Sequence, residues 1–74
     1  MPTLIRPTGM LKDYIGGRDE TEVEPGQTVR EALIALKIPP ELVALVSVNG
    51  ELQTKDYCLQ TGDVARVMAV IGGG

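Results

Sequence analysis

Apolar residues recur with helical spacing in the segment that follows Thr28. These positions lie three and four residues apart, on one face of a helix: Val29, Ala32, Leu33 and Leu36. Thr28 and Glu31 have the spacing of a capping box, in which each side chain accepts the backbone N–H of the other residue. Pro39 and Pro40 cannot continue a helix. The pattern therefore predicts one helix over residues 28–37.

Two short segments near the amino end have the composition of strands. Residues 3–6 are rich in β-forming side chains, and residues 20–24 alternate between Glu and other residues before Pro25. We expect them to pair as an antiparallel hairpin. The connection over residues 8–19 contains several glycines, which predicts irregular structure with a turn near Gly16-Gly17.

A second hairpin is predicted around Asn49-Gly50, the favoured pair for a two-residue type I′ turn. It would join a strand at residues 44–48 to a short strand at residues 51–53. After a turn at residues 61–63, residues 64–71 form the longest β-like segment. Its side chains alternate between two faces, with Val64, Arg66, Met68 and Val70 on one and Ala65, Val67, Ala69 and Ile71 on the other.

Together these elements predict a single α+β domain over residues 1–71 and a flexible glycine tail over residues 72–74. The domain would contain a mixed sheet of four to five strands, with one main helix packed on one face. If the last strand pairs parallel to the first at the centre of the sheet, the arrangement is a β-grasp fold. Periodicity alone does not fix that pairing.

Composition narrows the function of this 74-residue chain. It has no His and one Cys, which excludes His-dependent catalysis, His-based metal sites and Cys-rich metal clusters. A net charge of −3 argues against nucleic-acid binding. The longest apolar runs are far too short to span a membrane, and the single thiol suits a reducing compartment. We expect a cytoplasmic protein that binds neither nucleic acid nor membrane, and that is not a self-sufficient enzyme.

Three features could be mistaken for chemical sites. Cys58 has no cluster of positive charge to activate it and is more simply a semi-buried structural residue. Asp63, beside Gly62, is expected to be a turn carboxylate that accepts backbone N–H groups. The alternating Glu20, Glu22 and Glu24 are expected to protect an edge strand against aggregation. We therefore assign no catalytic residue and no metal site.

The carboxyl-terminal part of the chain resembles the ubiquitin-like sulfur carriers of the MoaD/ThiS family. The similarity lies in the Val48-Asn49-Gly50 turn, the segment from Leu59 through Gly62-Asp63-Val64, and the hydrophobic strand into terminal glycines. The Pro25-to-Val29 approach to the helix is also similar. The resemblance implies the β-grasp fold. The family often has Pro where Met68 or Ala69 stands, a difference we treat as neutral, and the family's Gly-Gly falls on Gly72-Gly73, so Gly74 is one residue extra.

The resemblance implies a role for the tail. An E1-like partner enzyme would use ATP to adenylate the terminal carboxylate, which would then become a thiocarboxylate. We expect this group on Gly74, or alternatively on Gly73, with Gly72 and Gly73 as the pliable tail. Glycines suit such a tail because they adopt many backbone conformations and let the chain approach another active site closely. The chain would bind no cofactor itself.

The resemblance also implies partners and several products. Besides the E1-like enzyme, we expect a sulfurtransferase or cysteine desulfurase and an acceptor like the molybdopterin synthase large subunit or thiazole synthase. Molybdenum or tungsten cofactor synthesis is the first hypothesis. Thiamine thiazole synthesis, tRNA thiolation, isopeptide-forming protein modification and a plain interaction module are the alternatives. Leu59, Met68 and Val70 are candidates for partner docking, with ordinary core packing as the competing interpretation.

Overall fold

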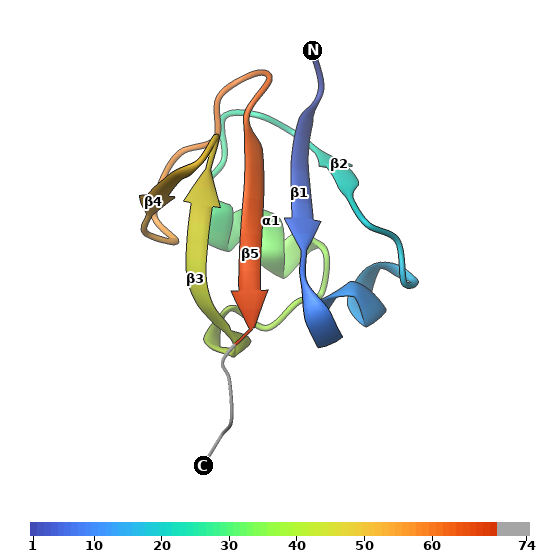
Figure 1. The fold of residues 1–74 in the computed structure, drawn as a ribbon. Helices are drawn as coiled ribbons and strands as arrows, with labels where there is room; N and C mark the ends of the chain where they lie inside the picture. Colours follow the sequence, from blue (N-terminus) through green and yellow to red (C-terminus); the bar gives the residue numbers. More distant parts are fainter. Residues whose placement is uncertain (70–74) are drawn as a thin grey trace.

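The computed structural model describes residues 1–69, and Figure 1 shows how their elements are arranged. The order along the chain is β1 (Thr3–Pro7), the 3₁₀ helix η1 (Gly9–Ile15), β2 (Thr21–Val23), α1 (Val29–Ala35), the 3₁₀ helix η2 (Pro40–Leu42), β3 (Val43–Val48), β4 (Glu51–Gln53) and β5 (Val64–Ala69). Among these residues, no helix is long and apolar enough to cross a membrane.

The five strands form one mixed sheet in the order β2-β1-β5-β3-β4. The first and last strands pair in parallel, with Ile5 opposite Ala65, whereas β3 runs antiparallel to β5 with Val46 opposite Val67. Strand β5 therefore occupies the centre of the sheet, and α1 lies behind it (Figure 1). The pairing that the sequence left open is the parallel one, and the predicted β-grasp fold is confirmed.

The core lies between α1 and one face of the sheet. Ala65 and Val67 of β5 have no exposed surface and face α1, with the other buried residues around them. The second face carries Arg66 and the half-buried Val64 and Met68 of β5. We call this second face, away from α1, the open face.

The predicted capping box is present at the start of α1. The Thr28 hydroxyl accepts the Glu31 N–H at 3.1 Å, and the Glu31 carboxylate accepts the Thr28 N–H at 2.8 Å. The helix ends at Ala35, two residues before the predicted end. The chain leaves it at Lys37, which has a left-handed φ of 64°. This turn brings Ile38 back into the core before either proline is reached.

The connection between β1 and β2 is more regular than predicted. Gly9–Ile15 forms η1, and the expected turn follows at Gly16 and Gly17, both with positive φ. The prediction of irregular structure was wrong because two apolar residues of this segment, Leu11 and Ile15, are buried four positions apart. Their burial stabilises a helical turn despite the surrounding glycines.

The second predicted hairpin is confirmed. Asn49 and Gly50 both have positive φ, as a type I′ turn requires, and Val48 pairs with Glu51 across it. Strand β3 contains a register irregularity between Val43 and Leu45. It allows Val43 to be buried while Leu45, two residues later, lies on the open face opposite Met68.

Candidate functional site

The candidate tail follows directly from the central strand. Strand β5 ends at Ala69, and the proposed site residues Gly72, Gly73 and Gly74 lie outside the described residues, as does Val70. Hydrogen-bonded neighbours hold β5 on both sides. The sheet therefore fixes the direction from which the chain approaches residues 70–74.

Two neighbouring segments hold the last residues of β5. The Val67 carbonyl accepts both the backbone N–H of Thr8, at 3.1 Å, and its hydroxyl, at 3.0 Å. On the other side, Ala69 pairs with Val43, the first residue of β3. The end of β5 is thus fastened to the start of η1 and to the end of η2. These contacts hold the end of β5 in the sheet.

A polar network built around Asp63 holds the beginning of β5. One carboxylate oxygen, Oδ2, accepts the Gln60 N–H at 2.9 Å and the Tyr57 hydroxyl at 2.8 Å. The other, Oδ1, accepts the Asn49 side-chain amide at 2.9 Å. Asn49 in turn accepts the Val64 N–H at 3.0 Å, so the network joins the β3–β4 turn to the first residue of β5. The expected role of Asp63 as a turn carboxylate is confirmed, and the hydrogen bonds from the Asn49 and Tyr57 side chains were not predicted from the sequence.

The network changes the acidity of two of its members. Burial alone would raise the pKa of Asp63, but the hydrogen bonds from Gln60, Tyr57 and Asn49 outweigh burial and hold its pKa below the ordinary value of 3.8. The hydrogen bond to Asp63, together with desolvation and the nearby negative charge, raises the pKa of the Tyr57 hydroxyl. The carboxylate is therefore charged and the phenol neutral at neutral pH, which matches a structural role.

The predicted docking residues separate between the two faces. Leu59 is 0% exposed and belongs to the core, so it offers no surface to a partner and must be removed from the predicted set. Met68 is half-buried on the open face. Sequence analysis missed Leu45 and Leu52 on that face, which are 49% and 69% exposed. The signal that could have found Leu52 is its place across the Asn49-Gly50 turn, where it pairs with Ser47 rather than with a buried valine.

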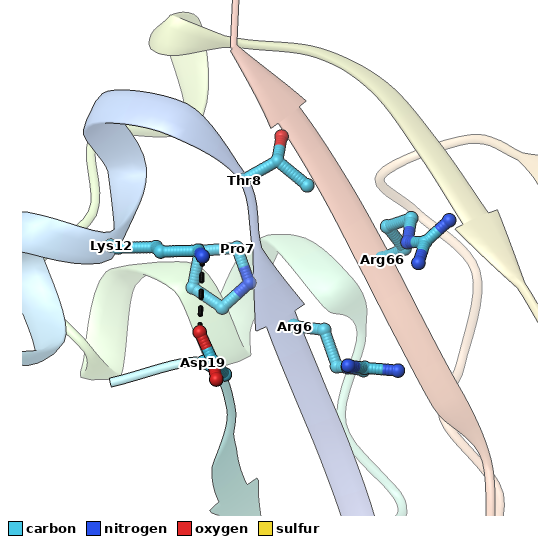
Figure 2. A pocket seen from close by; sticks show the side chains of 6 residues that line it. All are labelled: Arg6, Pro7, Thr8, Lys12, Asp19 and Arg66. Atoms are coloured by element: carbon cyan, nitrogen blue, oxygen red, sulfur yellow. Dashed lines mark hydrogen bonds and ion pairs between the residues drawn. The ribbon is translucent and has the colours of Figure 1, made fainter. Parts of the chain in front are cut away.

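Two arginines also lie on the open face. Arg6 of β1 and Arg66 of β5 are partners in the parallel register, and both are exposed. In Figure 2 the Arg6 side chain extends from β1 towards β5, away from the hydrogen-bonded Lys12 and Asp19. A hollow of about 110 Å³ lies here, lined by Arg6, Pro7, Thr8, Lys12, Asp19 and Arg66.

The remaining candidates show no sign of chemistry. Cys58 is exposed rather than semi-buried, and it lies in an isolated bridge to Thr28 outside the main sheet. Of the three alternating glutamates, Glu22 lies in the edge strand β2, while Glu20 approaches Arg6 at 3.6 Å. Within residues 1–69, no group of three or more metal-ligating side chains is found.

The fold defines a class: a ubiquitin-like β-grasp domain with its last strand at the centre of a mixed sheet. A sequence model of the ThiS family matches residues 8–74, nearly the whole chain. The chain therefore belongs to the ThiS family, within the MoaD/ThiS group of ubiquitin-like sulfur carriers. Members of this family are small carriers rather than catalysts. No curated protein matches the chain.

Solved structures share the fold at low sequence identity. A Pyrococcus furiosus protein provisionally named molybdopterin converting factor subunit 1 has a TM-score of 0.70 and 22% identity, covering 96% of this chain and 99% of that one. A Helicobacter pylori complex of molybdopterin-converting factor subunits 1 and 2 gives 0.61 and 20%, covering 100% of both chains. Urm1 from Trypanosoma brucei gives 0.64 and 18%, covering 99% and 95%.

Proposed function

We propose that this protein is a sulfur carrier whose carboxyl-terminal glycine is converted to a thiocarboxylate by partner enzymes. The observation that carries the proposal is the central β5 strand, which is fastened at both ends and is followed in the sequence by Gly72-Gly73-Gly74. A rigid body with a side-chain-free end suits delivery of a carboxylate into another protein's active site. Glycine allows the backbone to approach a nucleotide closely.

The chemistry requires the carboxylate to gain a leaving group. An E1-like enzyme would let the terminal carboxylate attack the α-phosphate of ATP, which forms an acyl-adenylate and releases pyrophosphate. A persulfide sulfur on a sulfurtransferase or cysteine desulfurase then attacks the acyl carbon, and AMP leaves. A second thiol reduces the resulting acyl disulfide, which frees the thiocarboxylate. The carrier supplies the terminus, and its partners supply ATP, sulfur and catalysis.

We propose molybdenum or tungsten cofactor synthesis as the destination of the sulfur. Two of the structures that share the fold bear the name of molybdopterin converting factor subunit 1, and nearly all of each chain is covered. The long β1–β2 connection, which carries η1, resembles carriers of this type, whereas the short step from Lys37 to Ala44 is more like the compact thiamine-type carriers. The acceptor would then be a protein like the large subunit of molybdopterin synthase. Thiamine thiazole synthesis and tRNA thiolation remain alternatives within the same chemistry.

We propose that partners dock on the open face. Leu45 and Met68 are opposite each other there, and exposed Leu52 lies on β4 beside β3. Exposed apolar groups on one face favour protein contacts. This face continues along β5 towards Ala69, so a partner bound there would lie close to the place where residues 70–74 begin.

Mass spectrometry of the intact chain tests the carrier function. The full chain is incubated with the adenylating enzyme and sulfurtransferase of the same organism, ATP and a persulfide source. We expect a mass increase equal to the exchange of one oxygen for one sulfur. Alkylation of the thiocarboxylate would prevent loss of the sulfur by hydrolysis before the measurement. Conjugates with lysines of other proteins would instead support a protein modifier, and an unchanged mass would contradict both.

Deletion of Gly74 identifies the reactive residue. If Gly74 carries the thiocarboxylate, we expect the chain ending at Gly73 to be loaded far more slowly than the full chain. Equal loading of the shortened chain, combined with trimming of the full chain before loading, would assign the reaction to Gly73. Omitting ATP is the control, because a sulfur gain without ATP cannot proceed through an adenylate.

A further inference from the structure

The open face contains an unfavourable pair of charges. Arg6 and Arg66 stand directly opposite each other on neighbouring strands β1 and β5. Like charges in this position repel and destabilise the pairing of strands. On the other side of Arg66, the register partner on β3 is Ser47, which brings no negative charge. The free protein therefore concentrates positive charge at the middle of its sheet, although the whole chain has a net charge of −3.

Compensation within the chain is incomplete. Glu20 approaches the Arg6 guanidinium at 3.6 Å, with both side chains about half exposed, so the attraction is weakened by water. Arg66 forms no ion pair within residues 1–69. The two guanidinium groups also border two hollows, the one described above and another of about 150 Å³ that reaches Ser47 and Asn49. The first hollow already holds Asp19, which is paired with Lys12 and also interacts with Arg6; the second has no acidic residue in its lining, so space for a further negative group is present there.

We propose that Arg6 and Arg66 form a binding site for the carboxylates of an acidic segment on the protein that docks on the open face. Guanidinium groups bind carboxylates with two parallel hydrogen bonds, which gives both strength and orientation. This inference rests on the docking proposed above and specifies the chemistry of the partner's surface. Binding would relieve the repulsion that the free protein carries.

The surroundings of the arginines favour a protein over a phosphate-bearing ligand. Apolar side chains follow them along the same face, Met68 on β5 and Leu45 opposite it on β3. A protein segment can supply apolar side chains for these positions beside its carboxylates. A nucleic acid would need stacking surfaces, and the open face has no aromatic residue among its described members. The expected partner surface therefore combines Asp or Glu with apolar residues.

A peptide titration tests this site without any carrier partner. Isotope-labelled full-length protein is titrated by NMR with a short peptide of alternating Leu and Glu, and with a matched peptide of alternating Leu and Gln, each to about 1 mM. We expect the Glu peptide to shift the amides of β1 and β5 around Arg6 and Arg66, and the Gln peptide to bind about tenfold more weakly. Absence of shifts there, or equal binding of both peptides, would overturn the proposal. So would tighter binding of inorganic phosphate or single-stranded RNA at the same amides.

Variants connect the site to the proposed partner. We expect Arg66→Gln to weaken binding to the adenylating enzyme about tenfold and to reduce the salt dependence of association. Lys37→Gln is the matched control, because it removes the same charge from the helix side of the molecule. The thermal midpoint of Arg66→Gln should equal or exceed that of the wild type, since the like-charge pair is gone. If the wild-type protein and Arg66→Gln bind the enzyme equally well, the proposed arginine site is wrong while the carrier function stands. If the enzyme binds neither protein but the Glu peptide binds the wild type, the arginine site stands and the proposed carrier function is contradicted.

Discussion

Asp63 joins three segments through one carboxylate, and this arrangement makes the side chain hard to replace. Its two oxygens accept from Gln60, Tyr57 and Asn49, and all three partners are donors. In Asp63→Asn, either orientation of the new amide turns an NH₂ group towards a donor. We expect the free energy of unfolding to fall by about 1–3 kcal/mol, measured by urea denaturation. Asp56→Asn is the control, because its pair with Arg30 lies at the surface; equal losses in both variants would contradict this account.

The same residue makes stability depend on pH. Because the native pKa of Asp63 is held below 3.8, the folded state favours the charged form more than the unfolded state does. This contribution is complete above the ordinary pKa and is lost as pH falls through the lower native value. Urea denaturation between about pH 6 and about pH 2 should show a steeper acid loss for the wild type than for Asp63→Asn. Parallel curves for the two proteins would show that other carboxylates dominate.

At the scale of elements, the end of α1 carries measurable strain. The Ile38 N–H bonds the Leu33 carbonyl at 2.9 Å and the Lys37 N–H bonds the Ile34 carbonyl at 3.0 Å, a Schellman motif. Lys37 occupies its left-handed position with φ of 64°, where glycine is preferred. We expect Lys37→Gly to raise the free energy of unfolding by about 0.5–1 kcal/mol, measured in urea. Lys37→Ala retains the Cβ and should not stabilise the protein; an equal gain would assign the effect to charge.

The elements also show what sequence can predict. The capping box at Thr28 and the Asn49-Gly50 turn depend on neighbouring residues, so the sequence alone was sufficient for both. The burial of Leu59 was missed because it depends on a long-range pairing: its N–H bonds the Gln27 carbonyl and its carbonyl accepts the Gly26 N–H, which holds the β4–β5 connection against the approach to α1. The exposure of Leu45 was missed for a different reason: the irregularity after Val43 shifts the alternation of faces along β3. The tail stays a prediction from its glycines and from the family resemblance, because residues 70–74 lie outside the described residues.

At the scale of the whole molecule, the two faces of β5 have different roles: one packs in the core and stabilises the fold, and the other lies on the open face, where we propose that partners dock. Val67 is fully buried against the core, whereas the next residue, Met68, lies on the open face opposite exposed Leu45. We expect Val67→Ala to lower the free energy of unfolding by roughly 2 kcal/mol, while its folded fraction still binds the adenylating enzyme normally. Leu45→Ala should change stability little, because its side chain is half exposed, and should weaken the complex severalfold.

Comparing these two variants isolates the role of the sheet itself. Urea denaturation gives the free energy of unfolding of each variant, and calorimetry gives its affinity for the adenylating enzyme. We expect Val67→Ala to change mainly the first quantity and Leu45→Ala mainly the second. If Leu45→Ala binds as tightly as the wild type, partners do not use the open face, and the route from docking to the terminus must start elsewhere. If Val67→Ala loses binding in its fully folded state, the position of β5 must itself be set by the core, because Val67 offers no surface to a partner. The fastening of β5 by Thr8 and Val43 argues that its position survives the loss of two methyl groups.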